Sequence, residues 1–159
     1  MLEEFKPIIA KHSIKFGVDS DLIRSIIMVE SSGIPYRARF EPDWKYFYFQ
    51  REYAEKLGIT VETETMFQAT SWGLMQIMGG VARELGYKLH LTALCNPDLN
   101  IEYGTMKIKS IMQRYGNSEM DVIAAYNAGS VIKTYSGIYK NEKYVDKVYS
   151  FLRQLRALK

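Results

Sequence analysis

The sequence predicts a single, mainly α-helical (all-α) domain with a short irregular or β-hairpin insertion around residues 40–70. Three observations support this fold class. Several segments place apolar residues at helical spacing, and Gly, Pro or a capping residue bounds most of them. The stretch 34–70 has no helical period and is rich in aromatic residues. No period of 20–50 residues repeats, which excludes a solenoid. With 159 residues, we expect the whole chain, 1–159, to form one domain.

The helices expected from apolar spacing, in chain order, are 2–16, 21–31, 81–85, 97–115, 118–128 and 141–158, and the insertion adds a short helix around 50–57 between the second and third of these. Ser20 is the expected N-cap of helix 21–31, and Ser118 with Asp121 resembles a capping box at the start of helix 118–128. Gly17 and Gly129 follow helices 2–16 and 118–128 and are typical of helix ends. Within the insertion the sequence further predicts an irregular hairpin.

The charge pattern argues against a nucleic-acid partner. The 21 Lys and Arg residues are scattered among 18 Asp and Glu, for a net charge of +3. Nucleic-acid binders usually gather their basic residues in a run or stripe. The small excess either favours approach to an anionic surface or serves solubility alone.

Cys95 is the chain's one cysteine, so no intramolecular disulfide can form, and we expect it to be a small core residue. His12 and His90 add no metal-ligand spacing, so neither a metal nor a cofactor is expected. The N-terminus lacks the pattern of a secretory signal. No apolar run approaches the ~18 residues that span a bilayer, so no integral membrane segment is expected.

Glu30 is the candidate acid/base. It follows Ile26 and Ile27 by one turn on the apolar face of the second helix, at the helix C-terminus. Desolvation and the negative end of the helix dipole would both raise the pKa of this carboxyl, as a proton donor to a glycosidic oxygen requires. The structural alternative is a Glu that turns to solvent or pairs with Arg24 or Arg37.

Three segments together resemble the catalytic domain of soluble lytic transglycosylases and the wider lysozyme-like family that contains goose-type lysozymes. They are Glu30-Ser31-Ser32-Gly33, Gly73-Leu74-Met75-Gln76-Ile77 and Ala125-Tyr126-Asn127-Ala128-Gly129, followed by Tyr144 in the final helix. Each is weak alone, but their order on a helical scaffold is specific. The resemblance covers residues ~15–155 and implies a lysozyme-like fold.

The resemblance implies that Glu30 protonates the oxygen between N-acetylmuramic acid and N-acetylglucosamine. The same residue then takes the proton of the muramyl C6 hydroxyl, which closes a 1,6-anhydro ring. Gln76 would contact an acetamido group in the substrate groove; its alternative is a side chain turned to solvent. Tyr126 and Tyr144 would lie near the acid, with core packing as the alternative for each. Asn127 would hold backbone or sugar, or cap its helix.

The segment before Gln76 also contributes predicted substrate contacts, through Ser71, Trp72 and Met75. Trp44 and Trp72 are the tryptophans we expect to stack on sugars. The other insertion aromatics are expected to pack against one another, because a glycan contact needs fewer rings.

The insertion is longer and more aromatic than the ordinary transglycosylase pattern, and it adds the acids Glu41, Asp43, Glu62 and Glu64. Glu41 is the candidate second carboxylate, which could activate water and make the enzyme an inverting hydrolase. Its alternative is a surface Glu paired with Arg37 or Arg39.

The predicted function is therefore cleavage of peptidoglycan glycan strands by a lytic transglycosylase that acts as a monomer. A hydrolysing muramidase is the second reading, and a non-catalytic wall-binding or structural module comes from another class. The small size and absent signal look like a bacteriophage endolysin or virion-associated lysin, made in the cytoplasm and acting on the wall. An exported bacterial enzyme without its leader is the alternative.

Overall fold

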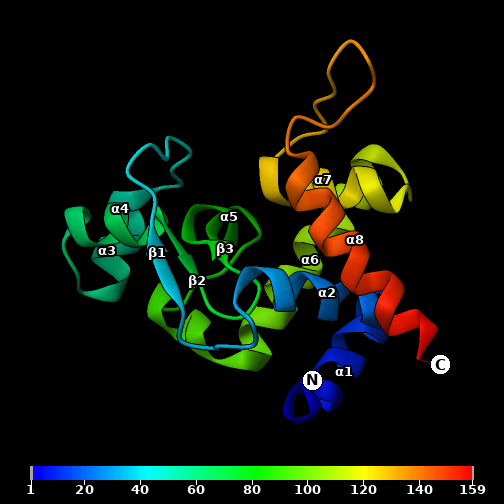
Figure 1. The fold of residues 1–159 in the computed structure, drawn as a ribbon. Coiled ribbons are helices and arrows are strands. Elements are labelled where there is room, and N and C mark those ends of the chain that lie inside the picture. Colours follow the sequence, from blue (N-terminus) through cyan, green and yellow to red (C-terminus); the bar gives the residue numbers. More distant parts are fainter. Residues whose placement is uncertain (1, 159) are drawn as a thin grey trace. The chain divides into compact units, whose positions relative to one another are not determined.

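A computed structural model describes residues 2–158. These residues are mainly helical and include a small three-stranded antiparallel sheet (Figure 1), which confirms the predicted fold class. The chain divides into two compact units. One combines the N-terminal segment through Val29 with the C-terminal segment from Thr105, and the other is Glu30–Gly104. That the whole chain forms one domain stays a prediction.

The first unit, here the helical unit, is built almost entirely of helices. They are α1 (Lys6–Phe16), α2 (Ser20–Glu30) up to Val29, α6 (Pro97–Tyr115) from Thr105, α7 (Glu119–Ala128) and α8 (Glu142–Ala157). Helices α7 and α8 pack against each other. The apolar positions at helical spacing are buried, among them Ile23, Ile26, Val145, Val148 and Leu152. The corresponding predicted helices are confirmed, with ends that shift by a few residues.

One predicted cap is confirmed and another is wrong. The Ser118 hydroxyl accepts a hydrogen bond from the Asp121 N–H at the start of α7. Helix α2, however, begins at Ser20 itself, and the Asp19 carboxylate accepts from the Asp21 N–H at 2.8 Å. Asp and Ser cap helices about equally well, so spacing alone did not separate the two neighbours.

A loop between α7 and α8 extends away from these two helices (orange in Figure 1). Lys133 and Tyr139 form an isolated antiparallel bridge at its base. Asp121 of α7 anchors this base, because it accepts a hydrogen bond from the Tyr139 hydroxyl at 2.5 Å and pairs with Lys133 at 3.0 Å. These partners lower the pKa of the Asp121 carboxyl, the Tyr139 hydrogen bond having the largest effect.

The second unit, here the sheet unit, carries the three strands. Strand β1 (Ala38–Phe40) pairs with β2 (Thr70–Trp72), which pairs with β3 (Ile77–Met78). Its other elements are α3 (Gln50–Leu57), α4 (Val61–Gln68), α5 (Gly79–Glu84), the 3-10 helix Leu91–Cys95 and the first part of α6. A core cluster gathers around Trp72, Ile77 and Leu91. Cys95 packs partly buried against it, and burial raises the pKa of its thiol.

The insertion contains one helix that the sequence did not predict. Helix 50–57 is confirmed as α3, and strands β1 and β2 pair at the two ends of the insertion, but helix α4 precedes β2. Residues 61–68 contain β-branched Val and Thr and show no clean apolar stripe, so the sequence pattern did not predict a helix there. A Thr60 cap and first-turn acids Glu62 and Glu64 stabilise it.

A buried ion pair holds α4 to α5. The Arg83 guanidinium donates to both carboxylate oxygens of Glu64 at 2.8 and 3.0 Å, and neither side chain is exposed. Arg83 also donates to the carbonyls of Tyr87 and Leu89, and it lies over the Tyr53 ring. Because every charge is matched by hydrogen bonds, the pair can be buried without a large penalty.

Candidate functional site

Glu30 is the last residue of α2 and is half-buried. Ile26 and Ile27, one turn earlier on the same face, have no exposed surface. The helix stops at Glu30 because the next residues leave helical geometry: Ser32 has φ +56° and Gly33 has φ +81°. The buried Ser31 hydroxyl accepts from the Gly33 N–H at 3.2 Å and holds this turn. The carboxyl-bearing residue is thus fixed at the end of an apolar helix.

Arg37 reaches back to the same helix end. Its Nη1 donates to the carbonyl oxygen of Glu30 at 3.3 Å, which provides a partner for one of the last carbonyls of α2. Arg24, the other predicted partner of Glu30, forms an ion pair with Asp21 at 3.4 Å. A cation beside the C-terminal carbonyls also complements the helix dipole.

Gln76 links the turn after Glu30 to the β2–β3 turn. Its Nε2 donates to the carbonyls of Arg37 (3.0 Å) and Gly73 (2.9 Å), and its Oε1 accepts from the Ser71 hydroxyl (3.0 Å). Both amide hydrogens therefore have protein partners. The Gly73 N–H adds a bond to the Arg37 carbonyl at 2.7 Å. We call these four residues the Gln76 clamp. These bonds support a positioning role for Gln76, and its predicted contact with an acetamido group stays a prediction.

Backbone geometry explains the residue types in this turn. Gln76 has φ +46° and Gly73 has φ +71°. A Cβ on Gly73 would lie 2.6 Å from the Leu94 carbonyl oxygen and would also meet the Asn100 side chain. Only glycine combines that left-handed conformation with so close an approach.

Asn100 is a buried residue that sequence analysis missed. Its Oδ1 accepts from the Met75 N–H at 2.7 Å, and its Nδ2 donates to the carbonyls of Trp72 and Leu94 at 2.8 Å each. It therefore fixes the β2–β3 turn to the sheet unit's own part of α6. A polar Asn inside a helix, where it is intrinsically disfavoured, was the available signal.

Met75 and Trp72 are core residues. Met75 has no exposed surface, and its side chain fills the space that the missing side chain of Gly104 leaves. The Trp72 indole N–H donates to the Phe67 carbonyl at 3.0 Å, and its ring packs edge-on against Phe67. Both side chains thus pack inside the sheet unit, and the sugar contacts predicted for them stay predictions. Ser71 is also buried and belongs to the Gln76 clamp.

The acids of the insertion have different surroundings. Glu41 pairs with Arg39 at 2.5 Å, the surface arrangement given above as the alternative to a second carboxylate. Glu64 is the buried partner of Arg83 and is committed to structure. Glu62 and Asp43 are exposed. Among residues 2–158 no cluster of three or more His, Cys, Asp or Glu side chains could hold a metal ion.

The remaining predicted site residues lie in the helical unit. Tyr126 is buried on α7, and the Lys107 ammonium lies 4.0 Å from its ring centroid while donating to its carbonyl at 2.7 Å. Asn127 is exposed, and its Oδ1 accepts from Asn141 Nδ2 at 3.0 Å. Tyr144 is half-buried on α8. A meeting of these residues with Glu30 stays a prediction.

The mainly helical fold with its small antiparallel sheet is consistent with a lysozyme-like protein. A comparison with protein families is more specific: the family model described as Transglycosylase SLT domain matches residues 7–147. The chain therefore belongs to the transglycosylase SLT family, which makes peptidoglycan its substrate class and lytic transglycosylase its general activity. Along residues 2–158 no helix is both long and apolar enough to cross a membrane.

Proposed function

We propose that the chain cleaves the β-1,4 bond between N-acetylmuramic acid and N-acetylglucosamine by a transglycosylase reaction with Glu30 as its acid and base. The observation that carries this proposal is a half-buried carboxyl at the end of an apolar helix, in a turn held by Arg37 and the Gln76 clamp. A general acid must be held in place and partly desolvated to protonate a poor leaving oxygen near neutral pH.

In the proposed reaction the Glu30 carboxyl gives its proton to the glycosidic oxygen as the bond to the muramyl C1 breaks. The resulting carboxylate then accepts the proton of the muramyl C6 hydroxyl, whose oxygen bonds to C1. Glu30 ends protonated, as it began, so one residue serves both steps. The muramyl N-acetyl group assists at C1, and no second carboxylate takes part. Tyr126, Asn127 and Tyr144 are the proposed sugar contacts of the helical unit.

Two substitutions test the role of Glu30. Glu30→Gln should reduce the lysis rate of a peptidoglycan suspension about 10²–10⁴-fold, the usual contribution of a general acid. Glu55→Gln, an exposed residue of α3, is the matched control and should lyse normally. If the Glu30 variant lyses walls at the control rate, the proposed mechanism is wrong.

The second reading is a hydrolysing muramidase that uses Glu41 to activate water. Mass spectrometry separates the two, because an anhydro-muramyl end is lighter than a reducing end by one water. We expect anhydro ends, and we expect Glu41→Gln to leave the products unchanged because Glu41 pairs with Arg39. Reducing ends alone, together with loss of activity in that variant, would establish the hydrolase instead.

A non-catalytic wall-binding module is the candidate from another class. It predicts that the native chain binds walls without releasing soluble fragments. A half-buried acid at a helix C-terminus opposes the helix dipole, and a simple binding module does not require one, which favours an enzyme. We further propose that the chain works as a monomeric lysin of bacteriophage type on wall peptidoglycan. A lysin of this type should cause lysis during phage infection, whereas an exported enzyme should be secreted by its bacterial host. The two outcomes distinguish the origins.

A further inference from the structure

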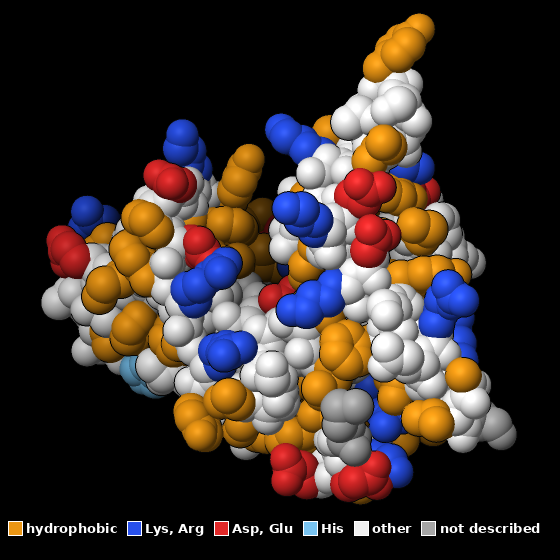
Figure 2. All heavy atoms as spheres, viewed as in Figure 1, with side chains coloured by type: hydrophobic (Ala, Val, Ile, Leu, Met, Phe, Trp, Pro, Cys, Tyr) orange, Lys and Arg blue, Asp and Glu red, His pale blue; other side chains and the backbone are white. Residues whose placement is uncertain are grey.

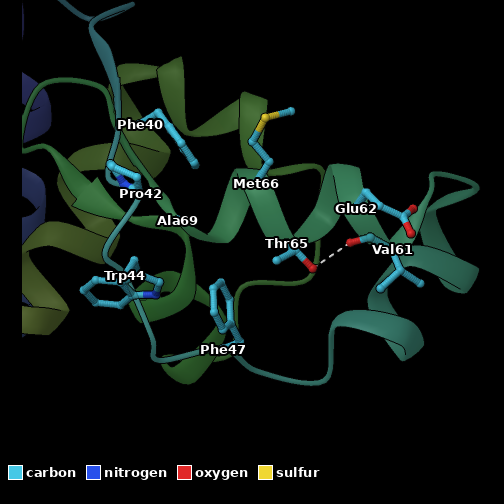
Figure 3. A pocket seen from close by; sticks show the side chains of 9 residues that line it. All are labelled: Phe40, Pro42, Trp44, Phe47, Val61, Glu62, Thr65, Met66 and Ala69. Carbon is cyan, nitrogen blue, oxygen red and sulfur yellow. Dashed lines mark hydrogen bonds between the residues drawn. The ribbon is translucent and has the colours of Figure 1, made fainter.

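A concave feature lies in the insertion, between the loop after β1 and helix α4 (Figure 3). Its cavity volume is about 410 Å³. We call it the aromatic pocket and define it by its lining residues: Phe40, Pro42, Trp44, Phe47, Val61, Glu62, Thr65, Met66 and Ala69. All of them belong to the sheet unit. In Figure 3 the Phe40 and Trp44 side chains come from β1 and the loop that follows it, Met66 comes from α4, and Phe47 projects from the loop towards α4.

The aromatic pocket is open to solvent. Phe40 is 53% exposed and Met66 50%, whereas the core cluster around Trp72 is buried. Hydrophobic side chains also gather on the surface over α3 and α4 (Figure 2). The insertion aromatics thus do more than pack against one another. Apolar side chains left open in a concave site are typical of a binding surface.

The loop that forms the pocket wall is held in place at three points. The Glu41 N–H donates to the Ala69 carbonyl at 2.8 Å. Buried Gln68 bonds both backbone groups of Tyr48, accepting from its N–H at 2.7 Å and donating to its carbonyl at 2.8 Å. At Gly80 of α5 a Cβ would lie 2.5 Å from the Tyr46 carbonyl, so glycine permits the loop to lie there. The pocket is therefore preformed, which lowers the entropic cost of binding.

The polar groups of the pocket accept hydrogen bonds. Glu62 contributes a carboxylate, and the Thr65 hydroxyl keeps lone pairs free while it donates to the Val61 carbonyl at 2.7 Å. The Trp44 indole N–H is already donated to the Tyr46 carbonyl at 2.7 Å. A suitable ligand therefore has hydrogen-bond donors and an apolar face, and it has no carboxylate, which Glu62 would repel.

We propose that the aromatic pocket binds an N-acetylglucosamine residue of the glycan strand, away from the bond that is cleaved. This sugar offers hydroxyl and amide donors, a C–H face for Trp44 or Phe47, and an uncharged acetyl methyl. Stem peptides carry carboxylates, as does a muramyl lactyl group without a stem peptide, and both fit less well. Strand β1, of ~10 Å, leads from the turn after Glu30 towards the pocket, so one glycan strand can follow it. The inference rests on the proposed glycan substrate.

The chain's two tryptophans provide a direct test. In ¹⁵N-labelled Glu30→Gln protein, titration with tri-N-acetylchitotriose should shift the indole N–H signal of Trp44 and leave that of buried Trp72 in place. Trp44→Phe assigns the signals. Phe47→Ala should weaken binding at this signal about 2–10-fold. Phe49→Ala is the control, since Phe49 is 70% exposed and does not line the pocket.

Several results would overturn the proposal. Shifts confined to amides around Glu30, with an unmoved Trp44 signal, would place the sugar elsewhere while leaving the proposed function intact. A Trp44 shift produced by an isolated stem tetrapeptide and not by the sugar would identify a peptide site. If Phe47→Ala lowers the melting temperature, the binding test uses Glu62→Arg, on the exposed first turn of α4, in its place. Unchanged sugar binding by the Glu62 variant would also refute the proposal. The proposed catalytic role of Glu30 is tested separately, by the rate of wall lysis.

Discussion

Replacing Gln76 by Glu distinguishes a clamp from a substrate contact. The substitution keeps the size of the side chain and removes its two N–H donors. In the folded protein those donors meet the carbonyls of Arg37 and Gly73 at 3.0 and 2.9 Å. The introduced carboxylate would face both carbonyl oxygens and keep only the bond from Ser71.

The magnitude follows from the bonds lost. Each net hydrogen bond is worth about 0.5–1.5 kcal/mol, so two of them contribute about 1–3 kcal/mol, and the repulsion of carboxylate and carbonyl oxygens adds to this. Both carbonyls keep a backbone partner, from the Gly73 and Gln76 N–H groups, which limits the loss. We expect the free energy of unfolding to fall by about 2–3 kcal/mol. The deficit should shrink at acid pH, because protonation of the introduced carboxyl restores one donor.

Urea denaturation and initial rates of wall lysis measure the two consequences. The clamp predicts a lower unfolding free energy together with a lower kcat, because the turn after Glu30 loses its support. Gln113→Glu, at an exposed position of α6, is the control and should change neither. A variant with normal stability and only a raised KM would refute the clamp and establish Gln76 as a substrate contact.

Three further predictions concern buried or anchoring polar groups. Asn100→Ala should lower the unfolding free energy by about 3–5 kcal/mol in urea denaturation, because it leaves three buried backbone groups without their partner. Arg83→Met should cost about 3–5 kcal/mol by isolating the Glu64 carboxylate, and the double variant with Glu64→Leu should recover most of it in the same assay. Asp121→Asn should lower the melting temperature at pH 6, since a carboxyl with a depressed pKa stabilises the fold above its unfolded pKa. This difference from the native protein should begin to shrink as the pH falls below the unfolded pKa of about 4, and it should disappear below the lowered pKa of the folded state, where Asp121 is protonated. A difference that does not shrink as the pH falls would contradict the assignment.

Helix prediction succeeded where local pattern and burial agree. The last helix buries Val145, Val148 and Leu152, three apolar residues at helical spacing, and it was predicted nearly to its ends. Helix α4 was missed because it has no clean apolar stripe and because part of its stability comes from a distant partner. Glu64 and Gln68 are both buried there, and the first of them pairs with Arg83 of another helix. No window of local sequence contains that pairing.

The candidate site divides in the same way. By itself the sequence determined the fold class, the position of Glu30 at the end of an apolar helix and the order of the motifs, because these depend on spacing along the chain. The tertiary structure decided what the neighbouring side chains do. It directed both donors of Gln76 to backbone carbonyls, buried Met75 and Trp72, and brought Asn100 to the β2–β3 turn. These roles depend on which polar groups and which empty volumes meet after folding, and sequence spacing does not encode such long-range complementarity.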